Sequence, residues 1–489
     1  MSNRRKHEKR THILCSSCNY SYVHDDKSPH ICIDLEPISG VATETDLGNL
    51  LDQIRYRNEP KLQRLLSEMR ACKKEIDEQL AVGKDKETLW KHCLDLGIAI
   101  LENLDWASIG VKQGSSLGRG SSTWDDADMW YVTWEDLDTI LDAEESLSKV
   151  IVVADTSPNV EEIKEKFFQR LVDRHGDVEC VDVQLYAREA DESSSAGKET
   201  ALRIKEKLLS SWGRSFTLTN KDPPWNLLNL ANLLEELTPK ILGRQRFQVV
   251  PTLDSRIVAE SSGGGKRRTA PLRFVDIMSC RVFTLCAQRG SVSGPHVDAL
   301  NGTFVRCLTG GKLWPFAQDL SEQDLESFKE HGDRWIPRRG VLKAAYLEPG
   351  HTIIMPAGKF VIHAPITVED CIMDGGQLWD EHKMDDVLRN IHCIVKSPNI
   401  TNEASAVQLP TMLDQLLSFM KVDPRRFART RDADEYLSLI EGLVAGIKRD
   451  IVCECERCRL ESCPCKQARG KAKVCRLACH GGRRQLCNN

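Results

Sequence analysis

The sequence predicts an α+β protein in which a jelly-roll β-barrel is flanked by helices and followed by a metal-binding segment. Residues 291–380 contain short β-branched runs separated by Pro/Gly turns, which is typical of a barrel or jelly roll rather than a parallel sheet. Apolar residues recur at helical spacing on both sides of this stretch. Eight of the 19 cysteines lie between Cys453 and Cys487, which indicates metal ligation.

The composition is that of an ordinary globular protein, with 41% hydrophobic and 28% charged residues among 489. The net charge of -5 gives no overall attraction to nucleic acid, so any basic surface must be local. No apolar run approaches the roughly 20 residues that cross a bilayer, and the start MSNRRKHEKR lacks the apolar part of a secretory signal. We therefore expect an intracellular protein with reduced thiols and no membrane partner.

The first two expected regions are a tail and a helical region. Residues 1–43 form a basic tail in which Cys15, Cys18, His24, His30 and Cys32 could make a zinc knuckle or could be incidental. Residues 44–145 predict two or three packed helices. Within this region Pro60 stands where a helix can begin, residues 110–122 predict a loop, and residues 124–149 look helical.

The barrel domain is expected over residues 146–400. Buried strands are predicted at 149–155 and 178–186 with a helix over 160–174 between them, a helix over 200–211, and a lead-in helix over PPWNLLNL. No Gly-rich turn follows the first strand, which argues against a nucleotide-binding unit. The run ESSGGGKRR is not a phosphate loop, because Arg267 stands where Ser or Thr is required.

A candidate metal site begins at His296 and Asp298. Side chains two apart in a strand project on the same face, so this pair can hold adjacent positions of one metal. A strand is expected over 304–308, then a TGG hairpin turn, so that Lys312 returns on an antiparallel neighbour and points into the same cavity. Later strands lead to His363, and two imidazoles with one carboxylate match the facial triad of non-haem Fe(II) oxygenases.

The motifs in this stretch resemble the Jumonji C (JmjC) family of Fe(II)- and 2-oxoglutarate-dependent dioxygenases, in particular its fungal branch. The matching motifs are Pro-His-x-Asp, Thr-Phe-Val-Arg, Gly-x-Lys-Leu-Trp and Pro-Gly-x-x-x-Ile-Met-Pro-x-Gly before a histidine. The resemblance covers roughly residues 222–399. It implies a double-stranded β-helix of the cupin type, with Fe(II) and 2-oxoglutarate as cofactors.

By this resemblance, His296, Asp298 and His363 are the Fe(II) ligands, and Lys312 pairs with the distal carboxylate of 2-oxoglutarate. Ser293 and Thr303 are further candidates for hydrogen bonds to the co-substrate. The turn before His363 carries two more residues than the family usually has, and His351 replaces the usual Asp after Pro-Gly. A ligand set with His351 in place of His363 therefore remains an alternative.

Beyond the barrel, residues 401–450 predict helices, and residues 451–489 predict a zinc module. Two sites of four thiolates would use all eight cysteines, and Cys-x-Cys pairs also allow bridged clusters. From residue 448 onward there are eleven Lys/Arg against four Asp/Glu, which favours DNA contacts; a zinc-stapled interaction tail is the alternative. The eight expected zinc ligands are Cys453, Cys455, Cys458, Cys463, Cys465, Cys475, Cys479 and Cys487.

Together these features predict a nuclear dioxygenase that acts at chromatin on histone or other protein substrates, as lysine demethylase or hydroxylase. Nuclear location is inferred from the zinc module and the basic start. Two alternatives remain: an inactive JmjC barrel that binds chromatin or DNA as a scaffold, and a cupin metalloenzyme that does not use 2-oxoglutarate.

Overall fold

The protein is described here from a computed structural model. Its contacts divide the chain into two units, Met1–Leu50 and Leu51–Asn489, and each is described by itself. The described residues are 12–14, 21–23, 44–82, 89–111, 126–143, 146–155, 157–176, 181–184, 196–212, 218, 223–231, 233–234, 239, 243–262, 281–403 and 409–451. In the first unit, strands β1 (His12–Leu14) and β2 (Ser21–Val23) form an antiparallel pair.

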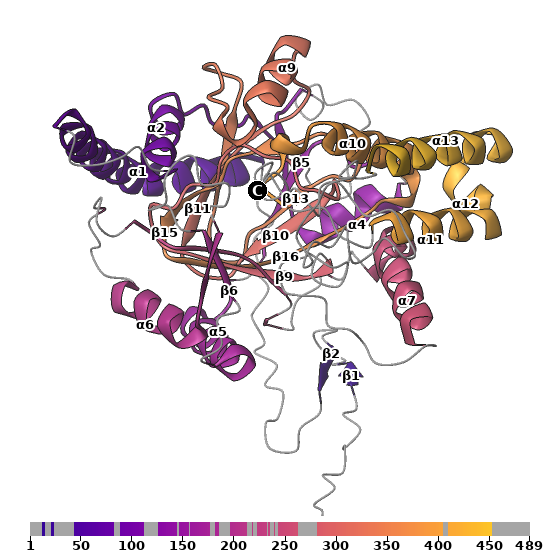
Figure 1. The fold of residues 1–489 in the computed structure, drawn as a ribbon, viewed down its shortest axis with the longest axis horizontal. Helices are drawn as coiled ribbons and strands as arrows, with labels where there is room; N and C mark the ends of the chain where they lie inside the picture. Colours follow the sequence, from indigo (N-terminus) through magenta and orange to yellow (C-terminus); the bar gives the residue numbers. More distant parts are fainter. Residues whose placement is uncertain are drawn as a thin grey trace, which may run out of the picture. The chain divides into compact units, whose positions relative to one another are not determined.

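Two helices precede the sheets, as the apolar spacing predicts. Helix α1 spans Glu44–Ala81 and α2 spans Leu89–Glu102 (Figure 1). Leu65 and Met69 of α1 are fully buried, so the predicted helical packing is confirmed. The expectation that Pro60 begins a helix is wrong, because Pro60 lies inside α1. Pro60 itself is exposed, where the carbonyl left without its usual N–H donor can bond to water.

A parallel β-unit follows where the sequence suggested only helix. Residues 124–149 contain strand β4 (Met129–Val132) before helix α4 (Trp134–Asp142), so the helical interpretation is wrong for its first half. All four residues of β4 are buried, and burial on both faces favours aromatic and β-branched side chains in a strand. Strand β4 pairs in parallel with β3 (Ile109–Val111) and with the predicted strand β5 (Val150–Val153).

These strands form one edge of a ten-stranded sheet with the order β3-β4-β5-β13-β10-β16-β9-β8-β6-β7. From β5 onward every pairing is antiparallel. The remaining strands are β6 (Val181–Gln184), β7 (Ala196–Glu199), β8 (Asn226–Ala231), β9 (Phe283–Ala287), β10 (Thr303–Cys307), β13 (Thr352–Met355) and β16 (Cys371–Gln377).

The lead-in segment PPWNLLNL is a strand and not the expected helix. Its last five residues and the following Ala231 form β8 (Asn226–Ala231), which pairs with β9 through an irregular register. Six residues of which four are apolar fit a helical pattern and a strand pattern equally well. Pairing with β9 makes this segment a strand. Helices α5 (Val160–His175) and α6 (Ala201–Ser211), both predicted, share an apolar cluster with β8, β9 and β16 and lie together in Figure 1.

A four-stranded sheet, separate from the ten-stranded one, contains His363. Strand β11 (Gly311–Ala317) is its centre and pairs with β12 (Lys343–Leu347), β14 (Ile362–His363) and β15 (Ile366–Glu369). The predicted TGG hairpin is therefore wrong, because β10 and β11 belong to different sheets. Gly310 has φ +69, and a Cβ there would meet the Asp370 carbonyl oxygen at 2.1 Å, so this crossing between sheets requires glycine.

The helices after the sheets share one large core with them. Trp130 and Phe304 of the large sheet lie in the same apolar cluster as Leu409 and Ile451. The remaining helices are η2 (Gln245–Phe247), α7 (Val249–Ser262), α9 (Glu322–His331), η3 (Gly332–Arg334), η4 (Glu381–Lys383), α10 (Met384–Lys396), η5 (Pro398–Ile400), α11 (Leu409–Val422), α12 (Pro424–Ala428) and α13 (Ala433–Ile451).

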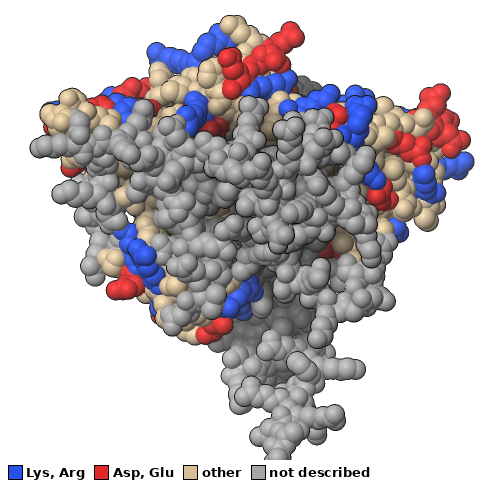
Figure 2. Space-filling view, in the orientation of Figure 1, with Lys and Arg blue, Asp and Glu red and all other residues tan. Residues whose placement is uncertain are grey.

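The α+β class expected from the sequence is confirmed. Among the helices of the described residues, none is both long and apolar enough to span a membrane. On the described part of the face shown in Figure 2, basic and acidic side chains are interspersed. This mixture agrees with the small net charge of -5.

Candidate metal centre

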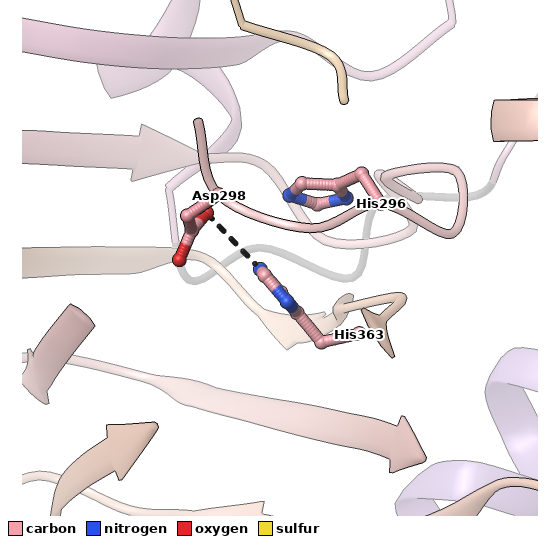
Figure 3. Close-up of side chains that lie close together, drawn as sticks. All are labelled: His296, Asp298 and His363. Carbon is pink, nitrogen blue, oxygen red and sulfur yellow. Dashed lines mark ion pairs between the residues drawn. The ribbon is translucent and has the colours of Figure 1, made fainter. Parts of the chain in front are cut away.

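His296, Asp298 and His363 come together in the structure. Each offers one ligand atom, and these atoms all lie within 4.8 Å of one another. His363 Nε2 lies 3.5 Å from Asp298 Oδ1, and Figure 3 shows the three side chains converging. The two imidazole rings have centroids 4.1 Å apart. Within the described part of the chain this is the one His/Cys/Asp/Glu group with metal-binding spacing.

Backbone pairing fixes the two histidines against each other. His296 and Asp298 lie between β9 and β10, whereas His363 ends β14. The His296 amide donates to the His363 carbonyl at 3.0 Å, and the His363 amide donates to the His296 carbonyl at 2.9 Å. The two extra residues in the turn before His363 therefore do not keep it from the other two ligands.

Each imidazole can present Nε2 toward the centre. His296 Nδ1 lies 2.7 Å from the carbonyl oxygen of Gly294, and His363 Nδ1 lies 3.5 Å from that of Val361. A carbonyl oxygen only accepts, so each Nδ1 is the protonated nitrogen and Nε2 keeps its lone pair. This arrangement is usual for metal-binding histidines, because it fixes both tautomer and ring orientation.

Burial keeps both imidazoles neutral. It lowers the pKa of His296 to about 3, with a smaller effect from neighbouring His363, and lowers the pKa of His363 to about 4. A neutral imidazole is the form that binds a metal. Because both residues are buried, at 6% and 3% exposure, their pairing with a cation would take place largely away from water.

Thr303 supports Asp298 from strand β10. Its hydroxyl contacts Asp298 Oδ2 in a short hydrogen bond, and it lies 3.2 Å from Gln377 Oε1. Burial raises the pKa of Asp298, and the neighbouring imidazole of His296 and the hydrogen bond from Thr303 act against that rise. The structure thus places Thr303, a co-substrate candidate in the sequence, beside a ligand carboxylate.

Lys312 is buried at 3% exposure on β11. Burial lowers the pKa of Lys312, and the thiols of Cys371, Cys307 and Cys286 act against that lowering. These cysteines belong to strands of the large sheet, so the lysine side chain faces that sheet across the interior. Among the described residues no carboxylate forms an ion pair with Lys312.

The segment before His296 supplies two serine hydroxyls to contacts with strands of both sheets. Ser293, the other co-substrate candidate, lies 3.4 Å from Asn226 Nδ2 on β8. Thr367 pairs directly with Lys312 across the small sheet, and its hydroxyl lies 2.8 Å from that of Ser291. The sequence did not point to Asn226 or Thr367, because only the sheet pairing brings them to this place.

His351 lies outside the triad. Its Nε2 is 3.1 Å from the Tyr131 hydroxyl, and its Nδ1 accepts from the Glu348 amide at 3.2 Å. Both ring nitrogens are used within the fold, so the imidazole has no lone pair left for a metal. The alternative ligand set with His351 is therefore not the one that the structure assembles.

Trp314 is a further residue that the sequence did not single out. Its ring stacks on His363, with centroids 5.5 Å apart and an angle of 9° between the planes. The signal was present in the motif Lys-Leu-Trp, because residues two apart in a strand share a face. The cysteines and histidines of the expected tail and zinc module, at residues 15–32 and 453–487, lie outside the described residues.

Comparison with known proteins gives one informative relative. No family model matches the chain. A curated protein named "KK-1 biosynthesis cluster protein D", from Curvularia clavata, is 27% identical over 334 residues. The alignment takes in 67% of this chain but 32% of that protein, so the chain spans about a third of the length of its relative.

Proposed function

We propose that the protein is an Fe(II)- and 2-oxoglutarate-dependent dioxygenase of the JmjC type. In this proposal His296, Asp298 and His363 hold the iron, and Lys312 binds the far carboxylate of 2-oxoglutarate. One observation carries the proposal: a buried lysine without a carboxylate partner among the described residues shares an interior with a His/Asp/His group.

The proposed fold is the double-stranded β-helix. Its two walls would be β9, β10, β13 and β16 of the large sheet and the four strands of the small sheet. The chain passes from β10 directly into β11, that is, from one wall to the other, as a jelly roll requires. Lys312 on one wall and the Cys307 and Cys371 thiols on the other support this arrangement.

The buried lysine supports an acidic ligand. Burying an ammonium group without an anion is costly, and the pKa of Lys312 is lowered by this burial. A carboxylate of an incoming ligand would remove the cost through a charge-assisted hydrogen bond. A dicarboxylate that also reached the metal would explain why the lysine and the triad face the same interior.

The donor set fits iron. Two neutral imidazoles and one carboxylate leave further coordination positions for a bidentate ligand and O2. Bound Fe(II) with 2-oxoglutarate supplies oxidation of a substrate C–H bond, which gives hydroxylation or, on an N-methyl group, demethylation. The chain's own part is to hold Nε2 of both histidines toward the metal, to orient Asp298 through Thr303 and to exclude water.

The proposed substrate is a protein at chromatin, with nuclear location and DNA contacts through a basic zinc module at residues 451–489. The excess of eleven Lys/Arg over four Asp/Glu after residue 447 supports this choice. The name of the Curvularia clavata relative favours a second candidate, oxidation of a small molecule in a biosynthetic pathway. The remaining alternatives belong to other classes of protein: a scaffold without catalytic turnover, and a metalloenzyme that does not use 2-oxoglutarate.

Anaerobic titration separates these classes. We expect the wild-type protein to bind Fe(II), and then 2-oxoglutarate only when the metal is present, with succinate released on exposure to O2. His296→Ala should abolish both while the zinc content is unchanged. Lys312→Met should keep metal binding and lose 2-oxoglutarate. Metal-independent binding, or no binding of 2-oxoglutarate at all, would contradict the proposal.

The substrate classes need a second measurement. Methylated histone peptides and a fungal small-molecule extract can each be tested for substrate-stimulated succinate release. Release that rises with peptide and yields formaldehyde favours demethylation at chromatin. Release that rises only with the extract favours the biosynthetic candidate.

A further inference from the structure

Trp314 occupies the interior face of β11 beside the candidate centre. It lies two residues from Lys312 and two from Phe316, so all three side chains project on the same face of the strand. All three are buried, with Trp314 at 2% exposure. Trp314 therefore lies between the proposed carboxylate-binding lysine and the strand position opposite His363, which pairs with Phe316.

The indole ring of Trp314 lies nearly parallel to the imidazole of His363, which is a proposed metal ligand. Its ring stacks on His363 at an interplanar angle of 9°, and His363 Nε2 is the atom directed at Asp298. Trp314 therefore contacts a proposed metal ligand and lies on the same strand face as Lys312.

The indole N–H has no acceptor in the part of the chain that the structure describes. Trp314 Nε1 is fully buried, and no group among the described residues lies within hydrogen-bonding distance of it. Other indoles show the usual arrangement: Trp379 Nε1 donates to the Leu300 carbonyl at 2.7 Å, and Trp134 Nε1 donates to Asp155 at 3.1 Å. A buried donor without an acceptor is unfavourable, and such groups in folded proteins call for an explanation.

We infer that the Trp314 N–H donates a hydrogen bond to an oxygen of the oxo-acid group of a ligand bound at the metal. The inference rests on the proposed function and adds a second anchor to it. Lys312 would hold the far carboxylate, and Trp314 would hold the end of the ligand at the metal. Trp314 is thus a co-substrate-positioning residue.

Two ligands of different length test this division of roles. Oxalate carries only the metal-binding end, whereas 2-oxoglutarate also carries the carboxylate proposed for Lys312. Affinities are measured by calorimetry in the presence of saturating Mn(II), which replaces Fe(II) without turnover. Trp314→Phe keeps an aromatic ring against His363 and removes the N–H. Trp379→Phe is the matched control, because its N–H is satisfied within the fold.

We expect Trp314→Phe to weaken oxalate and 2-oxoglutarate by the same factor, about tenfold, the loss of one hydrogen bond to a charged group. Mn(II) affinity should not change. Lys312→Met should weaken 2-oxoglutarate alone, and Trp379→Phe should lower the melting temperature without changing either affinity. Unchanged affinities in Trp314→Phe would overturn the inference, and so would a loss confined to 2-oxoglutarate.

A second variant covers the case in which Trp314→Phe does not fold. Site-specific replacement of Trp314 by 3-benzothienylalanine keeps the size and stacking of the indole and replaces N–H by sulfur. The same tenfold loss is expected. If the wild-type protein does not bind 2-oxoglutarate in the presence of metal, the proposed function is contradicted. If the wild-type protein binds both ligands and the Trp314 variants bind them equally well, only this inference is contradicted.

Discussion

At the scale of single residues, the hydrogen bonds around the triad prepare it for a cation. Backbone carbonyls fix the tautomers of His296 and His363, and Thr303 orients Asp298. None of these partners is charged, so the net charge of the site is set by Asp298 and by Lys312 nearby. Among the described residues, the hydroxyl of Thr303 is the one side-chain group that donates a hydrogen bond to the Asp298 carboxylate.

Replacing Thr303 by valine tests this support. Thr303→Val keeps the shape of the side chain but removes the hydroxyl donor to Asp298. We expect metal affinity to fall about tenfold or more, because removing a residue that orients a metal ligand typically lowers metal affinity by about that factor. Calorimetric titration with Mn(II) measures the change. Thr303→Ser retains the hydroxyl and should bind nearly as wild type; equal affinities in all three proteins would contradict the assigned role.

Acid should destabilise the metal-free protein through the two histidines. Their pKa values of about 3 and about 4 lie below the ordinary value of 6.5, so the unfolded chain binds more protons as the pH falls through this window. The free energy of unfolding should then decrease from pH 6.5 downward, by about 1.4 kcal/mol per pH unit for each imidazole. The raised pKa of Asp298 has the opposite effect on the free energy of unfolding, but it belongs to a single group, whereas two imidazoles titrate.

Urea unfolding at several pH values between 7.5 and 4.5 measures this slope. His296→Gln cannot titrate and should show a flatter dependence than the wild-type protein. Equal slopes would mean that the buried imidazoles do not control acid stability.

At the scale of elements, β11 carries Lys312 and Trp314, which are proposed to hold the two ends of the co-substrate. It also pairs with the strand that carries His363. The turn before β13 has a different role. His351 joins the Tyr131 hydroxyl of β4 to the Glu348 amide, and Glu348 also accepts from Asn58 of α1 at 2.8 Å. This turn therefore ties the large sheet to the first helix.

His351→Ala separates structural from metal-binding histidines. Two buried hydrogen-bonding groups would lose their partner, so we expect the free energy of unfolding to fall by about 1–3 kcal/mol. Mn(II) affinity should stay at the wild-type value because His351 is outside the triad. His363→Ala is the contrasting variant and should lose the metal. Loss of metal binding in His351→Ala, with the fold intact by circular dichroism, would contradict this assignment.

At the scale of the whole molecule, the helices after the sheets share an apolar core with the large sheet. Tyr436 and Ile451 of α13 lie in the same cluster as Ile354 of β13. Two ion pairs also join the helices to the core: Arg246 and Asp380 form a buried pair, and Arg426 and Glu381 form a partly buried pair at 2.6 Å. The region from 409 to 451 is thus part of the fold around the site.

Two truncations test this view. Deleting residues 452–489 removes the eight clustered cysteines and leaves the core through Ile451 in place. We expect the shortened protein to keep cooperative unfolding and Mn(II) binding, but to lack the zinc that we propose for these cysteines, as measured by elemental analysis. Deleting 409–489 removes core residues as well and should abolish cooperative unfolding. A protein that stayed folded after the longer deletion would show that the sheets do not need α11–α13 in order to fold.

Much of the fold could be predicted from local patterns. Helices α1, α2, α5 and α6 and strands β5 and β13 follow from apolar spacing and turn residues. The failures lie where a short segment fits two patterns, as in β4 and β8, or where a turn looks local but is not, as at Gly310. In each case pairing with a distant strand decided the outcome, and such pairing leaves little trace in a single sequence.

The sequence by itself determined the types of the candidate ligands, the position of Lys312 and the clustering of cysteines, because residue chemistry and close spacing are local properties. Tertiary structure alone decided that His363 rather than His351 joins His296 and Asp298, since that choice depends on backbone pairing between segments more than 60 residues apart. It also left Trp314 stacked on His363 with a buried N–H that finds no acceptor among the described residues. Only packing can create that situation, because burial and partners are fixed by the whole chain.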